Sequence, residues 1–146
     1  MAQAFHWFDY EKFKLECKRI LKSNSQIILV WNNRKEKASV TLEIFQTFKT
    51  FCPDFKGFTR GFDEKNIEIF FNGNFETKCF LNNLYFEKDK FINRCLSGSY
   101  SLAESDKDYN RYMIALESLF EKYSKENVLE MPNETKVYIG KVSSLY

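Results

Sequence analysis

The chain has 146 residues and is 44% hydrophobic and 29% charged, which predicts one domain spanning 1–146 with a substantial buried core. Its formal net charge of +2 is too small to indicate a polyanionic partner by itself. The longest clean apolar run, Ile27–Trp31, is too short to cross a membrane, and the first residues lack the basic and apolar regions of a signal peptide. These features predict a cytoplasmic protein.

The first predicted element is a helix over 10–22. Asp9 is placed to cap this helix, and Phe8 precedes the cap at the spacing that packs it onto Phe13. The run 26–31 that follows is apolar on both faces and predicts a central strand.

The stretch 38–45 alternates apolar and polar residues, which predicts a half-buried strand. A helix remains an alternative, because apolar residues from Ile44 to Cys52 recur at helical spacing, although the threonines disfavour a helix modestly. The next residues, 52–66, contain a proline and two glycines and predict a long loop.

The stretch Ile67–Leu81 has two apolar runs that meet at Asn72-Gly73, a strong signal for a β-hairpin. A two-residue loop would place each apolar residue opposite a polar one, so we expect a loop of odd length. One face would then carry Ile67, Ile69, Phe75, Thr77 and Cys79. The second face would carry Phe70 and Phe80, beside Glu68, Glu76 and Lys78. We expect the two phenylalanines to belong to the core, with an exposed contact surface as the alternative.

Two helices and a strand complete the predicted order. A short helix over 87–98 ends at a glycine. A long helix over 106–125 follows a possible capping box formed by Ser105 and Asp108, and 135–142 predicts a final strand. This order predicts an α+β fold, with a mainly antiparallel sheet of about four to five strands on which the N-terminal helix and the two later helices pack.

Four cysteines are spread along the chain without a CxxC pair, so a zinc site is not expected. A chain of this length can form its core without disulfides. We expect buried free thiols in a reducing compartment at Cys17, Cys52, Cys79 and Cys95.

Few residues suit catalysis. His6 is the only histidine, so a two-histidine metal site is excluded and a catalytic triad would depend on a residue near the chain end. The glycines are scattered and form no phosphate-binding loop. We therefore predict no catalytic residue, cofactor or metal. A small carboxylate-dependent enzyme is an alternative, with acidic groups at Asp54, Asp63 and Glu64 and at Glu104, Asp106 and Asp108.

The segment Phe55–Phe62 interleaves phenylalanine with basic residues, and its KGF matches the first three positions of an RNA-recognition motif before the match ends. Stacking of bases on Phe58 and Phe62 is therefore an alternative function. The basic residues available to it are Arg34, Lys35 and Lys37.

The leading hypothesis is a non-enzymatic protein-binding domain, because no catalytic constellation is present and 18% of the residues are aromatic. Its most concrete form is a bacterial immunity or antitoxin-type inhibitor that neutralises a protein toxin or enzyme by direct binding. The partner is then a protein, nucleic acid is the alternative, and no membrane is involved. The residues expected to contact the partner are Phe70, Phe80, Glu68, Lys78, Phe58, Arg60 and Phe62.

Overall fold

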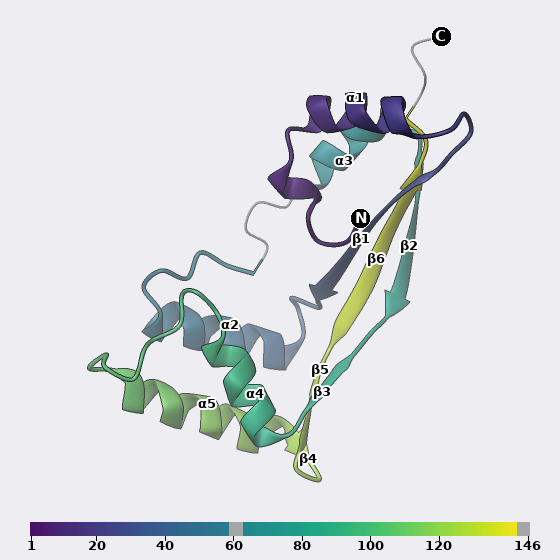
Figure 1. Cartoon of the computed structure of the whole chain (residues 1–146). Helices are drawn as coiled ribbons and strands as arrows, with labels where there is room; N and C mark the ends of the chain where they lie inside the picture. The colour runs from purple at the N-terminus through teal and green to yellow at the C-terminus, as the bar shows by residue number, and fades with distance from the viewer. Residues whose placement is uncertain (59–62, 143–146) are drawn as a thin grey trace. The chain divides into compact units, whose positions relative to one another are not determined.

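A computed structural model describes residues 1–58 and 63–142 (Figure 1). These residues form two compact units, each with its own hydrophobic core. Each unit combines helices with a three-stranded antiparallel sheet, so the α+β class is confirmed, whereas the expected single larger sheet is wrong. Unit 1 comprises residues 1–33, 63–81 and 134–142, and unit 2 comprises residues 34–58 and 82–133.

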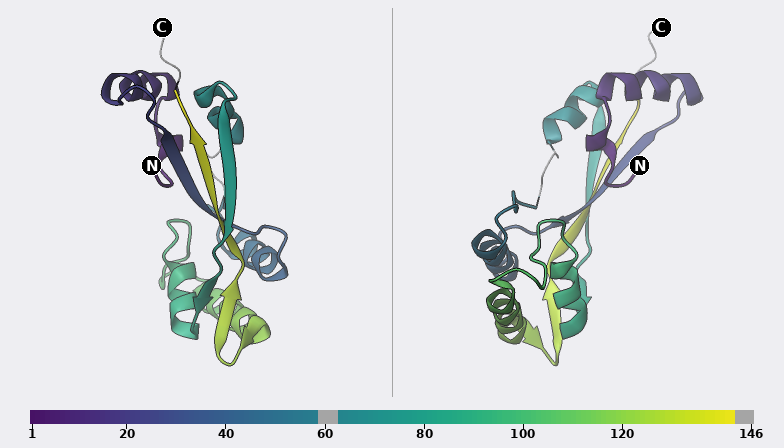
Figure 2. Two further views of the ribbon diagram at one scale, coloured as in Figure 1. Left: turned by 90° about the vertical axis from the view of Figure 1, so that its right-hand side faces the viewer. Right: turned by 60° about the vertical axis from the view of Figure 1, so that its left-hand side comes forward.

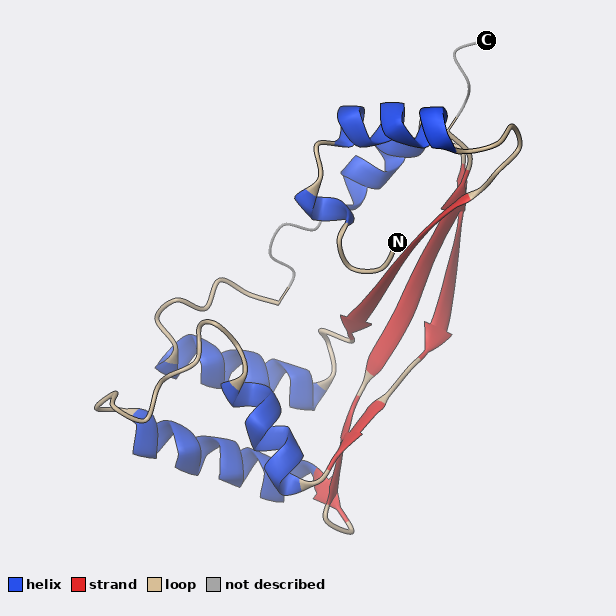
Figure 3. Ribbon diagram, viewed as in Figure 1, coloured by secondary structure: helices blue, strands red, loops and turns tan. Residues whose placement is uncertain are grey.

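Unit 1 is built on the sheet of β1 (Ile27–Arg34), β6 (Asn133–Gly140) and β2 (Phe75–Leu81), with β6 in the middle (Figure 2). The arrowheads of neighbouring strands point in opposite directions (Figure 3). The strand predicted over 135–142 is therefore confirmed as β6, although it begins two residues earlier than expected.

Three helical segments supply the rest of the unit 1 core: the 3-10 helix η1 (Phe5–Trp7), α1 (Tyr10–Ile20) and α3 (Glu64–Phe71). The predicted start of α1 is confirmed, although the helix ends at Ile20, two residues earlier than expected. Oδ1 of Asp9 accepts a hydrogen bond from the backbone N–H of Lys12 at 3.1 Å, which caps the helix. The rings before and after the cap, Phe8 and Phe13, stack with their centroids 5.1 Å apart.

Strand β1 lies at an edge of the sheet, so its predicted central position is wrong. The first residues of the chain run beside its outer edge. The backbone N–H of Val30 donates to the carbonyl of Met1, and that of Gln3 donates to the carbonyl of Val30, both at 2.9 Å. Only one face of β1 is buried, since Ile28 is 46% exposed. An apolar run does not reveal this arrangement, because it depends on pairing with a segment far away in the sequence.

Helix α2 (Ser39–Phe51) replaces the strand predicted over 38–45. Val40, Ile44 and Phe48 are buried at helical spacing in the core of unit 2. Burial of this stripe outweighs the modest helix penalty of the β-branched residues. The alternative helical interpretation was therefore the correct one.

The predicted hairpin is wrong, because its first arm is the end of helix α3. Asn72 terminates the helix in the left-handed conformation (φ 53°), and Gly73 follows with φ 71°. The N–H of Gly73 donates to the carbonyl of Glu68 at 2.8 Å, which closes the last turn. Asn-Gly thus ends a helix here, and β2 pairs with β6 instead of with the preceding run.

Gly140 lies at the end of β6, close to the turn between α3 and β2. A Cβ atom at this position would lie 2.5 Å from Cδ1 of Phe71 and 2.9 Å from the backbone oxygen of Asn74. Gly140→Ala is therefore expected to lower the free energy of unfolding by about 1–3 kcal/mol, the usual cost of overpacking a core. Urea unfolding measures the change, and a value within about 0.5 kcal/mol of wild type would contradict this close approach.

Unit 2 packs α2, α4 (Lys88–Leu96) and α5 (Tyr109–Tyr123) against a small sheet. The sheet has the order β3 (Leu84–Phe86), β5 (Val128–Met131) and β4 (Ser124–Lys125). The two helices predicted after the hairpin are confirmed, with shorter bounds than expected.

The start of α5 differs from the predicted capping box. Asp108 is the N-cap residue, but its side chain makes no capping hydrogen bond. Asp106 instead accepts a hydrogen bond from the backbone N–H of Ala103 at 2.7 Å, which stabilises the turn before the helix.

All four cysteines are free, and Cys17, Cys52 and Cys95 are buried, as expected. The expected burial of Cys79 is wrong, because its side chain is exposed on β2. In the described part of the chain, every helix is too short or too polar to cross a membrane.

Candidate functional site

Strand β2 presents an open edge of the unit 1 sheet. β6 pairs with one side of β2 along its whole length, from Phe75 opposite Gly140 to Leu81 opposite Glu134. Within residues 1–58 and 63–142, no strand pairs with the other side. At the opposite edge of the sheet, residues 1–3 pair with β1. The described part of the chain therefore closes one edge of this sheet and leaves the other open.

The side chains of β2 are exposed on both faces of the sheet from Glu76 to Leu81. Phe80 is 54% exposed and Leu81 is 72% exposed. An open edge offers unpaired backbone donors and acceptors to another strand. Here that edge lies beside exposed apolar side chains, which is the combination that a protein partner can use.

The face of the sheet that carries Phe80 is called the outer face. Phe80 lies opposite Thr135, and the two residues before it on this face, Lys78 and Glu76, lie opposite Val137 and Ile139. Directly opposed residues share a face, so apolar residues of β6 adjoin the opposite charges of β2.

Strand β1 adds two apolar residues to the outer face. Trp31 packs in the core against Tyr138, with ring centroids 5.9 Å apart, so the alternate residues of β1 point the other way. These residues are Ile28, which is exposed, and Val30, which is half-buried. The outer face thus combines an apolar strip with one acid and one base.

The inner face of the sheet holds a hydrogen-bonded cluster. The ammonium of Lys136 donates to Oε1 of Glu64 at 2.6 Å, and the hydroxyl of Tyr138 donates to the same oxygen at 3.0 Å. The hydrogen bond from Lys136 lowers the pKa of Glu64, and burial raises the pKa of Tyr138 to about 12. These contacts tie the start of α3 to β6, which is a structural role.

Glu64→Gln is expected to reduce the acid sensitivity of folding. Since folding lowers the pKa of Glu64, its stabilising contribution is present above the pKa of the unfolded glutamate and is lost as the pH falls. The Glu64 side chain is 55% exposed, so this contribution is expected to stay below about 1 kcal/mol. Urea unfolding at neutral and acid pH measures it. A stability difference between wild type and variant that does not shrink at acid pH would contradict the ion pair.

The residues predicted to contact a partner do not form one site. Phe70 is 1% exposed in the core of unit 1, and Glu68 lies exposed on α3. Lys78 and Phe80 share the outer face of β2, as expected. The prediction that Phe70 shares that face is wrong, because Phe70 belongs to a helix. Arg60 and Phe62 lie outside the described residues.

Phe58 is a packed residue of unit 2. The guanidinium of Arg34 lies over its ring, 4.2 Å from the centroid, and burial lowers the pKa of this arginine. The rings of Phe45, Phe48 and Phe55 also contact Phe58, at centroid distances of 5.3 to 6.0 Å. The ring face under Arg34 is therefore not available for stacking on a base.

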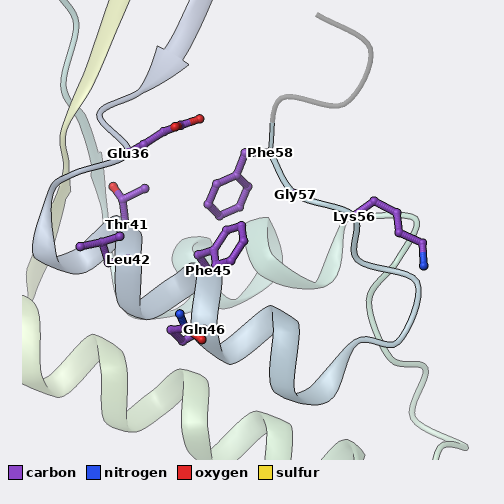
Figure 4. A pocket seen from close by; sticks show the side chains of 8 residues that line it. All are labelled: Glu36, Thr41, Leu42, Phe45, Gln46, Lys56, Gly57 and Phe58. Atoms are coloured by element: carbon purple, nitrogen blue, oxygen red, sulfur yellow. The ribbon is translucent and has the colours of Figure 1, made fainter.

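A pocket of about 390 Å³ lies beside Phe58 in unit 2 (Figure 4). The rings of Phe45 and Phe58 face each other on one side of it, and Thr41 and Leu42 at the start of α2 lie on the other. Lys56 extends away from the pocket. Glu36 also lines the pocket, and Figure 4 shows it on the side opposite Lys56.

Most of the acidic residues considered for catalysis have structural partners. Asp63 caps α3 by accepting from the backbone N–H of Lys65 at 3.0 Å, and Asp108 pairs with Arg111 at 3.0 Å. Among the described residues, no group of three or more histidine, cysteine and acidic side chains is placed to hold a metal. The single histidine, His6, lies beside Trp7 in η1.

The sequence-based site prediction included Phe80 but missed the apolar residues that β1 and β6 add to the outer face. Val137 and Ile139 alternate with inward-facing residues of β6, and this alternation is visible in the sequence. The sequence does not show that they share a face with Phe80, because this depends on β6 lying between β1 and β2.

Comparison of the chain with protein-family models found no match, and comparison with curated proteins found no significant match.

Proposed function

We propose that this chain is a cytoplasmic, non-enzymatic protein-binding domain that pairs β2 with an extended segment of a partner protein. The observation that carries this proposal is the open edge of β2, with exposed residues from Glu76 to Leu81, in a sheet whose other edge the chain closes itself. Strand addition to such an edge is a recurrent mode of recognition, in which backbone hydrogen bonds supply affinity and alternate side chains supply specificity.

The side chains of β2 define the partner segment. A strand paired with β2 places every second side chain on the outer face, next to Phe80 and the charges of Glu76 and Lys78. An apolar residue beside Phe80 extends the apolar strip of the sheet. An acidic residue beside Lys78 and a basic residue beside Glu76 satisfy the two charges, since opposite charges on neighbouring strands attract.

The most concrete form of this function is a bacterial immunity or antitoxin-type inhibitor that neutralises a protein toxin or enzyme by direct binding. Such an inhibitor needs a rigid contact surface and no reacting groups. A sheet edge held by the packed core of unit 1 supports this role, because elements of a scaffold position a contact more accurately than loops do.

The proposal is tested with two variants of the edge strand, Phe80→Asp and Lys78→Glu. Ile114→Asp is the control, because Ile114 is 64% exposed and lies on α5 in unit 2. Wild-type protein is used to capture partners from the cell of origin, and the partner is identified by mass spectrometry and purified. Its Kd for wild type and for each variant is then measured by calorimetry, together with inhibition of the partner's activity.

Both edge variants are expected to bind at least about tenfold more weakly than wild type, a loss of about 1.4 kcal/mol, while the control binds normally. Stoichiometric inhibition of the partner supports the inhibitor role. A partner that binds both edge variants as tightly as wild type contradicts the β2 site. Recovery of nucleic acid without a stoichiometric protein contradicts the protein-binding function.

A further inference from the structure

A second pocket lies in unit 1, at the end of α1 away from its N-cap. Its volume is about 330 Å³. Lys18 and Lys22 line it from the end of α1 and from the residues just after the helix, and Lys141 lines it from the residue after β6. Ser23, Ser25 and Asn74 add hydroxyl and amide groups that can donate hydrogen bonds. Among the residues that the structure describes, no acidic side chain lines this pocket.

Two basic residues of α1 outside this pocket have acidic partners. Lys12 pairs with Asp9 at 3.6 Å, and Arg19 pairs with Glu16 at 2.6 Å. In the part of the chain that the structure describes, the three pocket lysines form no ion pair. Lys12 and Arg19 are therefore neutralised by a neighbour in the chain, whereas the pocket lysines have no acidic partner among the described residues.

The C-terminus of α1 explains the position of only two of the three pocket lysines. The carbonyl groups at a helix C-terminus carry a partial negative charge of about half a unit, which attracts lysines at the last turn. That attraction explains Lys18 and Lys22 but not Lys141, which comes from a different element. Three ammonium groups around one pocket leave a clear positive excess, which favours an anion.

We propose that this pocket binds a small phosphate-bearing molecule that carries two or more negative charges. Lysine ammonium groups recognise phosphate as point charges, and hydroxyl and amide groups complete the hydrogen bonds of its oxygens. The volume lies at the lower end of the range for small-molecule sites, about 300–1,000 Å³. It therefore has room for a ligand at least as large as a diphosphate.

Inorganic pyrophosphate is the probe for this proposal. Its binding to the full chain is measured by calorimetry and by chemical-shift changes at Ser23, Ser25 and Asn74. The test variant replaces all three pocket lysines with glutamine: Lys18→Gln, Lys22→Gln and Lys141→Gln. The control variant removes the same charge from exposed positions of unit 2: Lys37→Gln, Lys49→Gln and Lys107→Gln.

The pocket variant is expected to bind pyrophosphate at least about tenfold more weakly than wild type, whereas the control keeps most of the affinity. The shift changes are expected to cluster at the pocket residues and to be larger with pyrophosphate than with monovalent chloride at equal ionic strength. Equal weakening in both variants would mean that only net charge matters and would overturn the site. Absence of binding at millimolar pyrophosphate would overturn it as well. A circular dichroism spectrum of each variant confirms that it is folded.

Discussion

Phe70→Ala is expected to lower the free energy of unfolding by about 3–5 kcal/mol, the usual cost of removing a buried phenylalanine ring. Phe70 is 1% exposed, and its ring lies 4.9 Å from Phe5 and 5.4 Å from Phe13 between centroids. It therefore joins α3 to η1 and α1, and its removal leaves a cavity lined by rings from three elements. Urea unfolding followed by tryptophan fluorescence measures the change.

Phe80→Ala is the matched control for Phe70→Ala, since the same side chain is removed ten residues further along the chain. Phe80 is 54% exposed, so the variant is expected to stay within about 0.5 kcal/mol of wild type. Equal losses for the two variants would contradict the burial of one phenylalanine and the exposure of the other.

Phe48→Ala is expected to have an effect of the same size in unit 2, about 3–5 kcal/mol. Phe48 is 1% exposed on α2, and its ring contacts Phe55 and Tyr100, both at a centroid distance of 5.3 Å. This ring holds the segment after α2 and the segment after α4 against the same helix. Urea unfolding followed by circular dichroism at a helical wavelength measures the loss.

Leu42→Ala on the same helix is the control for Phe48→Ala. Leu42 is 51% exposed, so its loss is expected to change the free energy of unfolding by no more than about 0.5 kcal/mol. If residues 38–45 formed the predicted strand instead, Leu42 would lie on its buried face and its replacement by alanine would be costly. A larger loss for Leu42→Ala than for Phe48→Ala would therefore contradict helix α2.

Helices α1 and α5 could be predicted because their signals come from residues that are close together in the sequence. The N-cap at Asp9 and the ring pair of Phe8 and Phe13 identified α1 because all their interactions lie within one turn of the chain. The long apolar stripe of α5 was equally clear, and its residues Tyr112, Leu116 and Phe120 are fully buried. In both helices the decisive residues lie only three to five positions apart in the sequence.

Asn72-Gly73 shows where local signals become ambiguous. Both residues adopt positive φ readily, and this property suits a hairpin turn and the end of a helix equally well. The preceding run is apolar at too many positions to separate a period of two from a period of 3.6. Packing decides between them: Ile67, Phe70 and Phe71 face the unit 1 core at helical spacing.

The candidate site could be predicted only in part. Alternation along β2 correctly placed Phe80 and Lys78 on one face. The open edge depends on which strands pair, and the decisive partners, β2 and β6, are more than fifty residues apart in the sequence. The closure of the other edge by residues 1–3 is likewise a long-range contact. Neither feature leaves a pattern in a short window of sequence.

Amide hydrogen exchange of β2, with and without the partner, reports directly on strand addition at the open edge. The account predicts that binding slows the exchange of backbone amides between Glu76 and Leu81 that point away from β6, because they become donors to the added strand. Exchange on α5 around Ile114, remote in sequence from β2, serves as the internal reference. A complex that forms at full affinity while exchange across β2 stays unchanged would contradict the account.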